Sequence, residues 1–217
     1  MLGDMPQRMF VAVVPPVQVV DDLSDFLEPR RDAGMPWIHP EQWHLTLAFM
    51  EAVPHRSIET LVEHLEEAAA RRRPFSLRLA GAGAFPDPTR AKVLWLGVGG
   101  PPELERLAVN VRAAASTAGA PVDGKAFRPH LSLAHLKRPV EATRWLRILG
   151  TFAGRSWEVD GFDLIASHLG DGPNGRPRHQ VVERFTLGAD VRDGPTEGAT
   201  DGATSAVTNG WRSGAGG

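Results

Sequence analysis

Hydrophobic residues follow two different periods along the chain. Short apolar runs bounded by glycine and proline alternate with longer segments in which apolar residues recur every three or four positions. The short runs predict strands at 9–14, 43–49, 75–79, 93–98, 130–136, 157–166 and 180–187. The helical period predicts helices at 17–31, 58–71, 103–118 and 141–152.

The predicted elements contain a repeat. A strand that begins at His44 is followed by a helix and a strand at Phe75, and a strand that begins at His130 is followed by a helix and a strand at Trp157. Two such units predict an α+β fold with two antiparallel lobes, related by a pseudo-twofold axis, around a central cleft. A doubly wound parallel sheet is the alternative, but no glycine-rich phosphate loop follows a predicted strand.

Each unit opens with the pattern His-Leu-hydroxyl-Leu. The pattern reads His44, Leu45, Thr46, Leu47 in the first unit and His130, Leu131, Ser132, Leu133 in the second. Because strand side chains alternate, the imidazole and the hydroxyl share one face and lie ~7 Å apart, a spacing that can straddle a phosphate. Two facing pairs would let one imidazole take a proton from water while the other protonates a leaving oxygen, as metal-free phosphodiester hydrolysis requires.

Either motif alone also fits a structural role. A single strand histidine is more often a hydrogen-bonded structural residue, and threonine or serine suits a strand by propensity. The recurrence of the pattern at corresponding places favours the functional interpretation.

The sequence indicates neither a metal site nor a serine or cysteine nucleophile. The sequence has neither an H-E-x-x-H nor a G-x-S-x-G motif. His130 and His135 are five residues apart, which on a regular strand places them on opposite faces. The absence of cysteine excludes disulfides, cysteine-bound zinc, iron–sulfur clusters and a thiol nucleophile. We therefore expect no metal and no cofactor.

Composition and charge limit the number of domains, the ligands and the location of the protein. With 217 residues, 42% of them hydrophobic, the chain can form one domain or two small lobes. The formal net charge of −2 gives no global positive field, so any RNA must be held locally. No apolar run approaches the ~18 residues of a membrane span, and the run near the N-terminus is too short for a signal-peptide core. We expect a soluble, cytoplasmic monomer with no membrane partner.

The composition changes after Leu187. Residues 188–217 are mostly Gly, Ala, Thr, Asp, Ser and Arg, with too little apolar surface to offset the chain entropy lost on folding. We expect a two-lobed domain over 1–187 and a disordered tail over 188–217. A partner-binding peptide around Trp211 is the alternative for the tail.

Several segments resemble the two-histidine phosphoesterases, and within them the bacterial and archaeal RNA 2′,3′-cyclic phosphodiesterases, historically called 2′-5′ RNA ligases. The segments are 8–13, 37–40 with 44–49, 85–86 with 92–98, 127–134 and 182–185. The resemblance thus extends over all but the termini.

The resemblance implies a bilobal α+β fold and cofactor-free hydrolysis of RNA 3′ ends or nucleoside 2′,3′-cyclic phosphates to 2′-phosphates. It implies that His44 and His130 form the catalytic pair. We assign His130 as the base that activates water and His44 as the acid that protonates O3′, and the opposite polarity is the alternative. The resemblance further implies that Thr46 and Ser132 bind nonbridging phosphate oxygens. Arg128, two residues before His130, is a further candidate phosphate contact. The alternatives are cleavage or joining of 2′,5′-linked RNA, which needs the same motif residues, and nucleotide or RNA-end binding without turnover.

Three positions depart from the family pattern. Ser132 stands where threonine is usual, His135 where arginine or lysine is common, and His179 near a usual aromatic position. The first change keeps the hydroxyl but loses the stiff χ1 of threonine. The other two alter the surface expected to contact RNA. The remaining histidines are expected to be structural or surface residues: His39, His55, His64 and His168.

Overall fold

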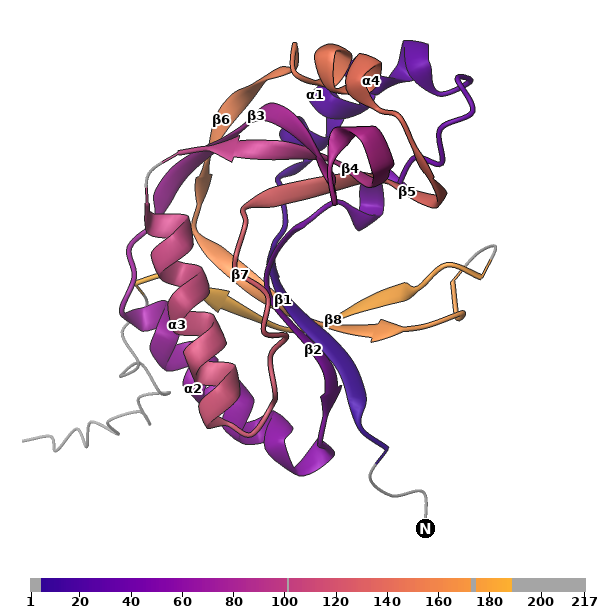
Figure 1. The fold of residues 1–217 in the computed structure, drawn as a ribbon. Coiled ribbons are helices and arrows are strands. Elements are labelled where there is room, and N and C mark those ends of the chain that lie inside the picture. Colours follow the sequence, from indigo (N-terminus) through magenta and orange to yellow (C-terminus); the bar gives the residue numbers. More distant parts are fainter. Residues whose placement is uncertain (1–4, 101, 173–174, 189–217) are drawn as a thin grey trace, which may run out of the picture.

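The computed structural model describes residues 5–100, 102–172 and 175–188. Strands in this part of the chain form one curled antiparallel sheet in the order β6-β3-β4-β5-β2-β1-β7-β8 (Figure 1). They are β1 (Gln7–Val13), β2 (Leu45–Val53), β3 (Phe75–Phe85), β4 (Ala91–Gly99), β5 (His130–Val140), β6 (Ala153–Val159), β7 (Gly161–His168) and β8 (Arg178–Thr186). The predicted α+β class is confirmed.

The sheet consists of two four-stranded halves. We call β3, β4, β5 and β6 the His130 half, and β1, β2, β7 and β8 the His44 half, because His130 opens β5 and His44 directly precedes β2. Among the described residues, strand pairing joins the halves at one place, where Leu45 of β2 lies opposite Leu131 of β5. This narrow junction gives the two-lobed arrangement that the repeat predicted.

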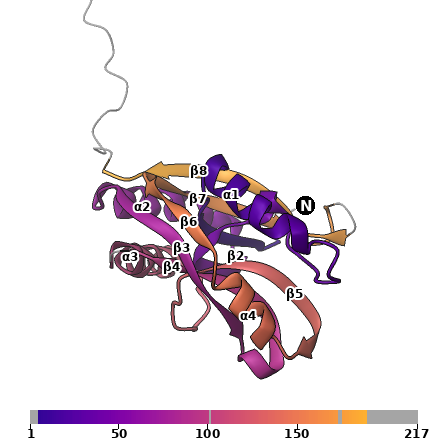
Figure 2. The same ribbon diagram turned by 90° about the horizontal axis from the view of Figure 1, so that it is seen from above.

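Helices pack on both halves of the sheet. They are α1 (Val17–Leu27), α2 (Ile58–Ala70), α3 (Glu103–Thr117) and α4 (Thr143–Leu149). α2 and α3 lie side by side (Figure 2) and pack on the His44 half, against β8 and β2. α1 and α4 pack on the His130 half, against β6 and β3. α1 follows a strand of the His44 half but covers the His130 half, and α3 crosses in the opposite direction. The buried residues of α1, Val19, Leu23 and Leu27, have the spacing of one helix face.

Both motif strands contain a β-bulge at the second leucine of the motif. In the β1–β2 ladder Val11 pairs with Ala48 but Ala12 pairs with Thr46, so Leu47 is the extra residue. In the β4–β5 ladder Leu94 pairs with Ala134 but Trp95 pairs with Ser132, so Leu133 is the extra residue. A bulge shifts the alternation of side chains by one position. The residue five places after each motif histidine therefore returns to the face of that histidine.

The predicted strand at 157–166 is wrong as a single element. The chain forms β6 and β7, which belong to different halves, with a break at Asp160. Gly161 begins β7, where a Cβ would lie 2.4 Å from the carbonyl oxygen of Phe185, so only glycine permits this close approach. In addition, β3 and β6 pair with each other in the His130 half. The twofold relation therefore holds for the motif strands but not for the last strands of the two predicted units.

The described part of the chain ends just after the predicted boundary between domain and tail. β8 ends at Thr186, and Leu187 and Gly188 follow it. The predicted tail, with Trp211, lies outside the described residues apart from Gly188. No helix in the described ranges is long and apolar enough to cross a membrane.

Candidate active site

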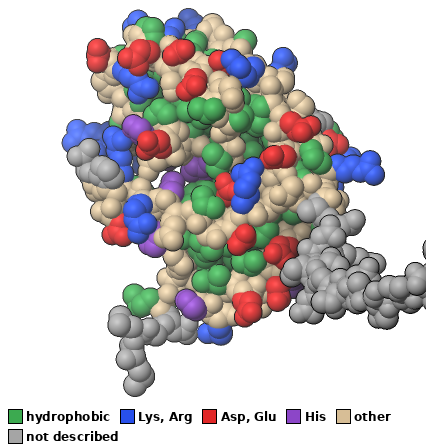
Figure 3. Space-filling model, turned by 180° about the vertical axis from the view of Figure 1, so that it is seen from behind, with side chains coloured by type: hydrophobic (Ala, Val, Ile, Leu, Met, Phe, Trp, Pro, Cys, Tyr) green, Lys and Arg blue, Asp and Glu red, His purple; other side chains and the backbone are tan. Residues whose placement is uncertain are grey.

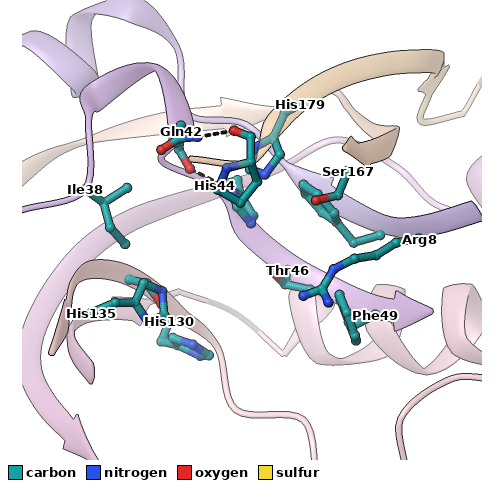
Figure 4. A pocket seen from close by; sticks show the side chains of 13 residues that line it. Arg8, Ile38, Gln42, His44, Thr46, Phe49, His130, His135, Ser167 and His179 are labelled. Carbon is teal, nitrogen blue, oxygen red and sulfur yellow. Dashed lines mark hydrogen bonds between the residues drawn. The ribbon is translucent and has the colours of Figure 1, made fainter. Parts of the chain in front are cut away.

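The two motifs face each other across a cleft of about 310 Å³ between the halves. His44 and Thr46 line it from the His44 half, and His130 and Ser132 line it from the His130 half (Figure 4). Histidine side chains gather at the hollow between the halves when the molecule is seen from behind (Figure 3). Other lining residues are Arg8, Phe10, Ile38, Gln42, Phe49, His135, Ser167, Pro177 and His179.

The motif leucines point away from the cleft, as alternation predicted. Leu45, Leu47, Leu131 and Leu133 are each at most 1% exposed and belong to the main hydrophobic core. Burying one leucine side chain stabilises a fold by about 1.5–3 kcal/mol. The packing of these leucines therefore fixes which face of each strand presents the imidazole and the hydroxyl.

A backbone hydrogen bond fixes each motif imidazole in the same way. Nδ1 of His44 lies 2.7 Å from the carbonyl oxygen of Gln42, and Nδ1 of His130 lies 2.7 Å from the carbonyl oxygen of Arg128. A carbonyl only accepts, so Nδ1–H donates and Nε2 is left for chemistry. Each carbonyl belongs to the residue two positions before its histidine, so the same local hydrogen bond orients both imidazoles.

The loop before His44 is anchored to the segment that leads into β8 of the same half. Pro40–Gln42 forms the short helix η2, and the Gln42 side-chain amide donates to the carbonyl of Pro177 at 2.8 Å. Gln42 therefore holds the η2 turn against the segment that leads into β8 while its carbonyl orients His44.

Aromatic rings pack against the two imidazoles. Phe10 stacks on His44 with 4.6 Å between ring centroids. Phe85 meets His130 edge to face at 5.0 Å, and Trp95 lies 6.0 Å away. These apolar rings restrict the imidazole orientations and exclude water from one side of each ring.

The cleft favours neutral imidazoles in the free protein. Burial lowers the pKa of His44 to about 4 and outweighs the Nδ1 hydrogen bond, which raises it. The neighbouring imidazoles, that of His179 first, lower the pKa of His44 further. Burial also lowers the pKa of His130, with a smaller contribution from the Arg128 charge. Both imidazoles are therefore mainly neutral at pH 7.

The charge of the lining suits an anion. The lining includes the positive guanidinium of Arg8 and four imidazoles that become positive on protonation, and its described residues contain no carboxylate. A bound phosphate would favour the protonated imidazole, because an opposite charge at close range raises the pKa of a histidine.

The prediction that His130 and His135 lie on opposite faces is wrong. Both line the cleft, because the bulge at Leu133 turns His135 back to the face of His130. Burial lowers the pKa of His135, and the His130 charge lowers it further. Phe49 lies at the corresponding place after the bulge at Leu47 and also lines the cleft.

Arg128 does not line the cleft between the histidines. β5 begins at His130, so Arg128 precedes the strand and its side chain lies in an adjoining groove, with its guanidinium 5.6 Å from the Phe85 ring centroid. Its carbonyl, rather than its charge, contacts His130. A phosphate contact by the guanidinium stays a prediction.

The remaining predicted structural histidines lie outside the cleft lining. His39 is 3.5 Å from Glu41, His168 lies 3.2 Å from the Gln180 side chain, and His64 lines a crevice between α2 and α3. Sequence reasoning missed Arg8, Phe10, Gln42 and Ser167 as lining residues, since these come from strands and turns whose proximity depends on tertiary pairing.

Metal ligation has no geometric basis in the described ranges. Residues 5–100, 102–172 and 175–188 contain no group of three or more His, Asp or Glu side chains placed to hold a metal ion. Independence from metal stays a prediction that a chelator tests.

Comparison with known proteins places the chain in a family. The family model of the 2′-5′ RNA ligase superfamily matches residues 19–171. The chain belongs to the 2′-5′ RNA ligase superfamily. Among its relatives in this superfamily, the RNA 2′,3′-cyclic phosphodiesterase of Thermus thermophilus is 31% identical over 88% of this chain and 97% of that protein. That of Aquifex aeolicus is 33% identical over 70% of this chain and 81% of that protein.

Solved structures share the fold of this superfamily member. The apo form of Escherichia coli LigT has a TM-score of 0.68 and 26% identity over 84% of this chain and 98% of that one. A solved Thermus thermophilus protein has a TM-score of 0.68 and 29% identity, over 84% of this chain and 99% of that one.

One sequence relative is matched over a shorter segment. The RNA 2′,3′-cyclic phosphodiesterase of Geobacillus stearothermophilus is 38% identical, and the match covers 45% of this chain and 31% of that relative.

Proposed function

We propose that the protein hydrolyses the 2′,3′-cyclic phosphate of RNA 3′ ends or nucleosides to a 2′-phosphate, with His44 and His130 as acid and base. One observation carries the proposal: two imidazoles, each held through Nδ1 by the carbonyl two residues upstream, face each other beside two hydroxyls. The relatives named RNA 2′,3′-cyclic phosphodiesterase support the reaction. The structure of Escherichia coli LigT complexed with 3′-AMP supports binding of a nucleotide.

The chemistry needs two proton transfers. Nε2 of neutral His130 takes a proton from water as the water oxygen bonds to phosphorus. The bond from phosphorus to O3′ breaks, and Nε2 of protonated His44 gives its proton to O3′. The products are a 2′-phosphate and a free 3′-hydroxyl. The hydroxyls of Thr46 and Ser132 donate to the nonbridging oxygens, where charge accumulates in the transition state.

This polarity uses the low pKa of His44. A proton donor with a low pKa loses its proton more readily, which suits His44 as the acid. The cost is that burial disfavours the protonated form of His44 in the free cleft. The anionic substrate reduces this cost, because it stabilises a protonated imidazole. Either polarity gives the same bell-shaped pH dependence.

The test identifies the product in the presence of a chelator. Purified protein dialysed against EDTA is incubated with adenosine 2′,3′-cyclic phosphate, and the phosphomonoester is identified by ³¹P NMR. We expect adenosine 2′-phosphate at an unchanged rate, since no step uses a metal. Loss of activity that zinc restores would reject the metal-free mechanism.

The same assay, repeated with a 2′,5′-linked oligoribonucleotide, separates the alternatives. Binding of the cyclic phosphate without any product would identify a binding module. Cleavage or joining restricted to 2′,5′-linked RNA would identify the ligase-type activity. The cytoplasmic location and the monomeric state stay predictions.

A further inference from the structure

A second groove of about 770 Å³ continues the cleft. The two share Thr46, Phe49 and His130, so the groove opens directly from the place where the motifs meet. The other groove residues are Leu47, Ala48, Phe85, Val93, Arg112, Asp123, Lys125, Ala126, Phe127 and Arg128. The groove has more than twice the volume of the cleft, so it can hold more than a cyclic phosphate.

The charged residues leave the groove positive. Arg112 lies 3.3 Å from the Asp123 carboxylate and donates to the carbonyl of Lys125 at 3.0 Å. The amide of Asp123 donates to the carbonyl of Phe49 at 3.0 Å, which ties this loop to β2. Arg112 therefore balances Asp123 and orders the loop. Lys125, whose side chain is 87% exposed, lies 4.0 Å from the same Asp123 carboxylate, so Arg112, Lys125 and Arg128 face one acidic side chain and leave the lining with an excess of two positive charges.

Aromatic rings line the groove beside these cations. Phe49, Phe85 and Phe127 contribute their rings. The Phe85 ring centroid lies 5.0 Å from that of the His130 imidazole and 5.6 Å from the Arg128 guanidinium. Cations that hold a backbone and rings that stack on bases are the combination by which proteins bind single-stranded nucleic acid.

We propose that this groove binds the RNA segment that precedes the terminal nucleotide. The inference rests on the proposed function, which puts the 2′,3′-cyclic phosphate between His44 and His130. The preceding phosphodiester then meets Lys125 and Arg128, and its base lies against an aromatic ring. A mononucleoside cyclic phosphate has a single phosphate, which the cleft holds, and places no phosphate beside Lys125 and Arg128. RNA ends are therefore preferred over free cyclic nucleotides.

Steady-state kinetics test the preference. The full chain is assayed with adenosine 2′,3′-cyclic phosphate and with the dinucleotide ApA ending in the same group. We expect kcat/KM to be higher for the dinucleotide by about tenfold or more, from one phosphate contact and one stacked base. Equal values for the two substrates would overturn the inference and leave the proposed function standing.

A matched pair of lysine variants tests the groove itself. Lys125→Ala should lower kcat/KM for the dinucleotide by about threefold or more and leave the mononucleotide value unchanged, since an exposed charge pair contributes modestly. Lys125→Arg should retain the preference. Lys92→Ala, on β4 and outside the groove lining, should change neither value. An equal loss on both substrates in Lys125→Ala would contradict a role specific to the longer RNA.

A direct binding measurement tests the groove without requiring turnover. Anisotropy of a fluorescein-labelled triadenylate 3′-phosphate gives Kd for the wild type, Lys125→Ala and Lys92→Ala. Weaker binding in Lys125→Ala alone supports the groove, even if the protein hydrolyses neither substrate and the proposed function fails. Identical Kd values in all three proteins would reject the groove.

Discussion

At the residue scale, each motif imidazole has a fixed orientation and a lowered pKa. The Nδ1–H bonds leave Nε2 of each ring for the substrate. Burial lowers the pKa of both histidines, and His44 reaches about 4. The pair therefore holds one proton at a lower pH than two ordinary histidines would.

This shift predicts the pH dependence of catalysis. The active form carries one proton on the pair, so kcat/KM should be bell-shaped with its maximum between about pH 4 and pH 6.5. Above this range both imidazoles of the free protein are neutral and the acid is lost. Below it both are charged and the base is lost. Because bound phosphate raises both pKa values, the alkaline limb of kcat should lie at higher pH. Steady-state rates from about pH 3 to pH 10 cover both limbs, and a monotonic rise to pH 10 would contradict the pair.

At the element scale, regular alternation predicted the face of the motif residues but not that of His135. The four motif leucines are buried, as a pleated strand requires. The bulges at Leu47 and Leu133 depend on pairing with β1 and β4, which one strand's own pattern does not encode. A local signal was present, because leucine is followed by alanine in both motifs and two consecutive apolar residues interrupt the alternation.

Trp95 forms part of the wall behind His130, and Gly83 of β3 makes room for it. A Cβ on Gly83 would lie 2.0 Å from the Trp95 ring, so the ring must move in Gly83→Ala. We expect a loss of about 1–3 kcal/mol in the free energy of unfolding, as for other overpacked cores. We also expect kcat to fall about tenfold or more, because a displaced support shifts the imidazole.

Denaturant unfolding and steady-state kinetics measure both effects. Gly124→Ala is the matched control, since no heavy atom lies within 4 Å of its added Cβ, and its unfolding free energy should change by less than about 0.5 kcal/mol. If Gly83→Ala were as stable and active as the wild type, Trp95 would not be a rigid support.

At the scale of the whole molecule, pairing of β2 with β5 joins the halves in the described part of the chain, and α1 and α3 each follow a strand of one half and pack on the other. The repeat in the sequence predicted two lobes with facing motifs, because each motif lies at the start of its own strand. It did not predict that 157–166 divides between the halves, since an apolar run gives no sign of the sheet edge where each part pairs. Arg8, Gln42 and His179 reach the cleft through this long-range arrangement, which explains why local patterns did not identify Arg8 and Gln42.

The central claim is that the two facing imidazoles act as one acid–base pair. The most direct measurement is kcat for His44→Ala, His130→Ala and the double variant on a 2′,3′-cyclic phosphate, with exposed His55→Ala as control. Each single change should lower kcat by at least ~10², or ~2.7 kcal/mol in barrier, and the double change should add little, because residues that act as a unit are not additive. His44→Gln keeps bulk at this half-buried site and should lose as much. A folded His44→Ala or His44→Gln protein with nearly full turnover would contradict the account.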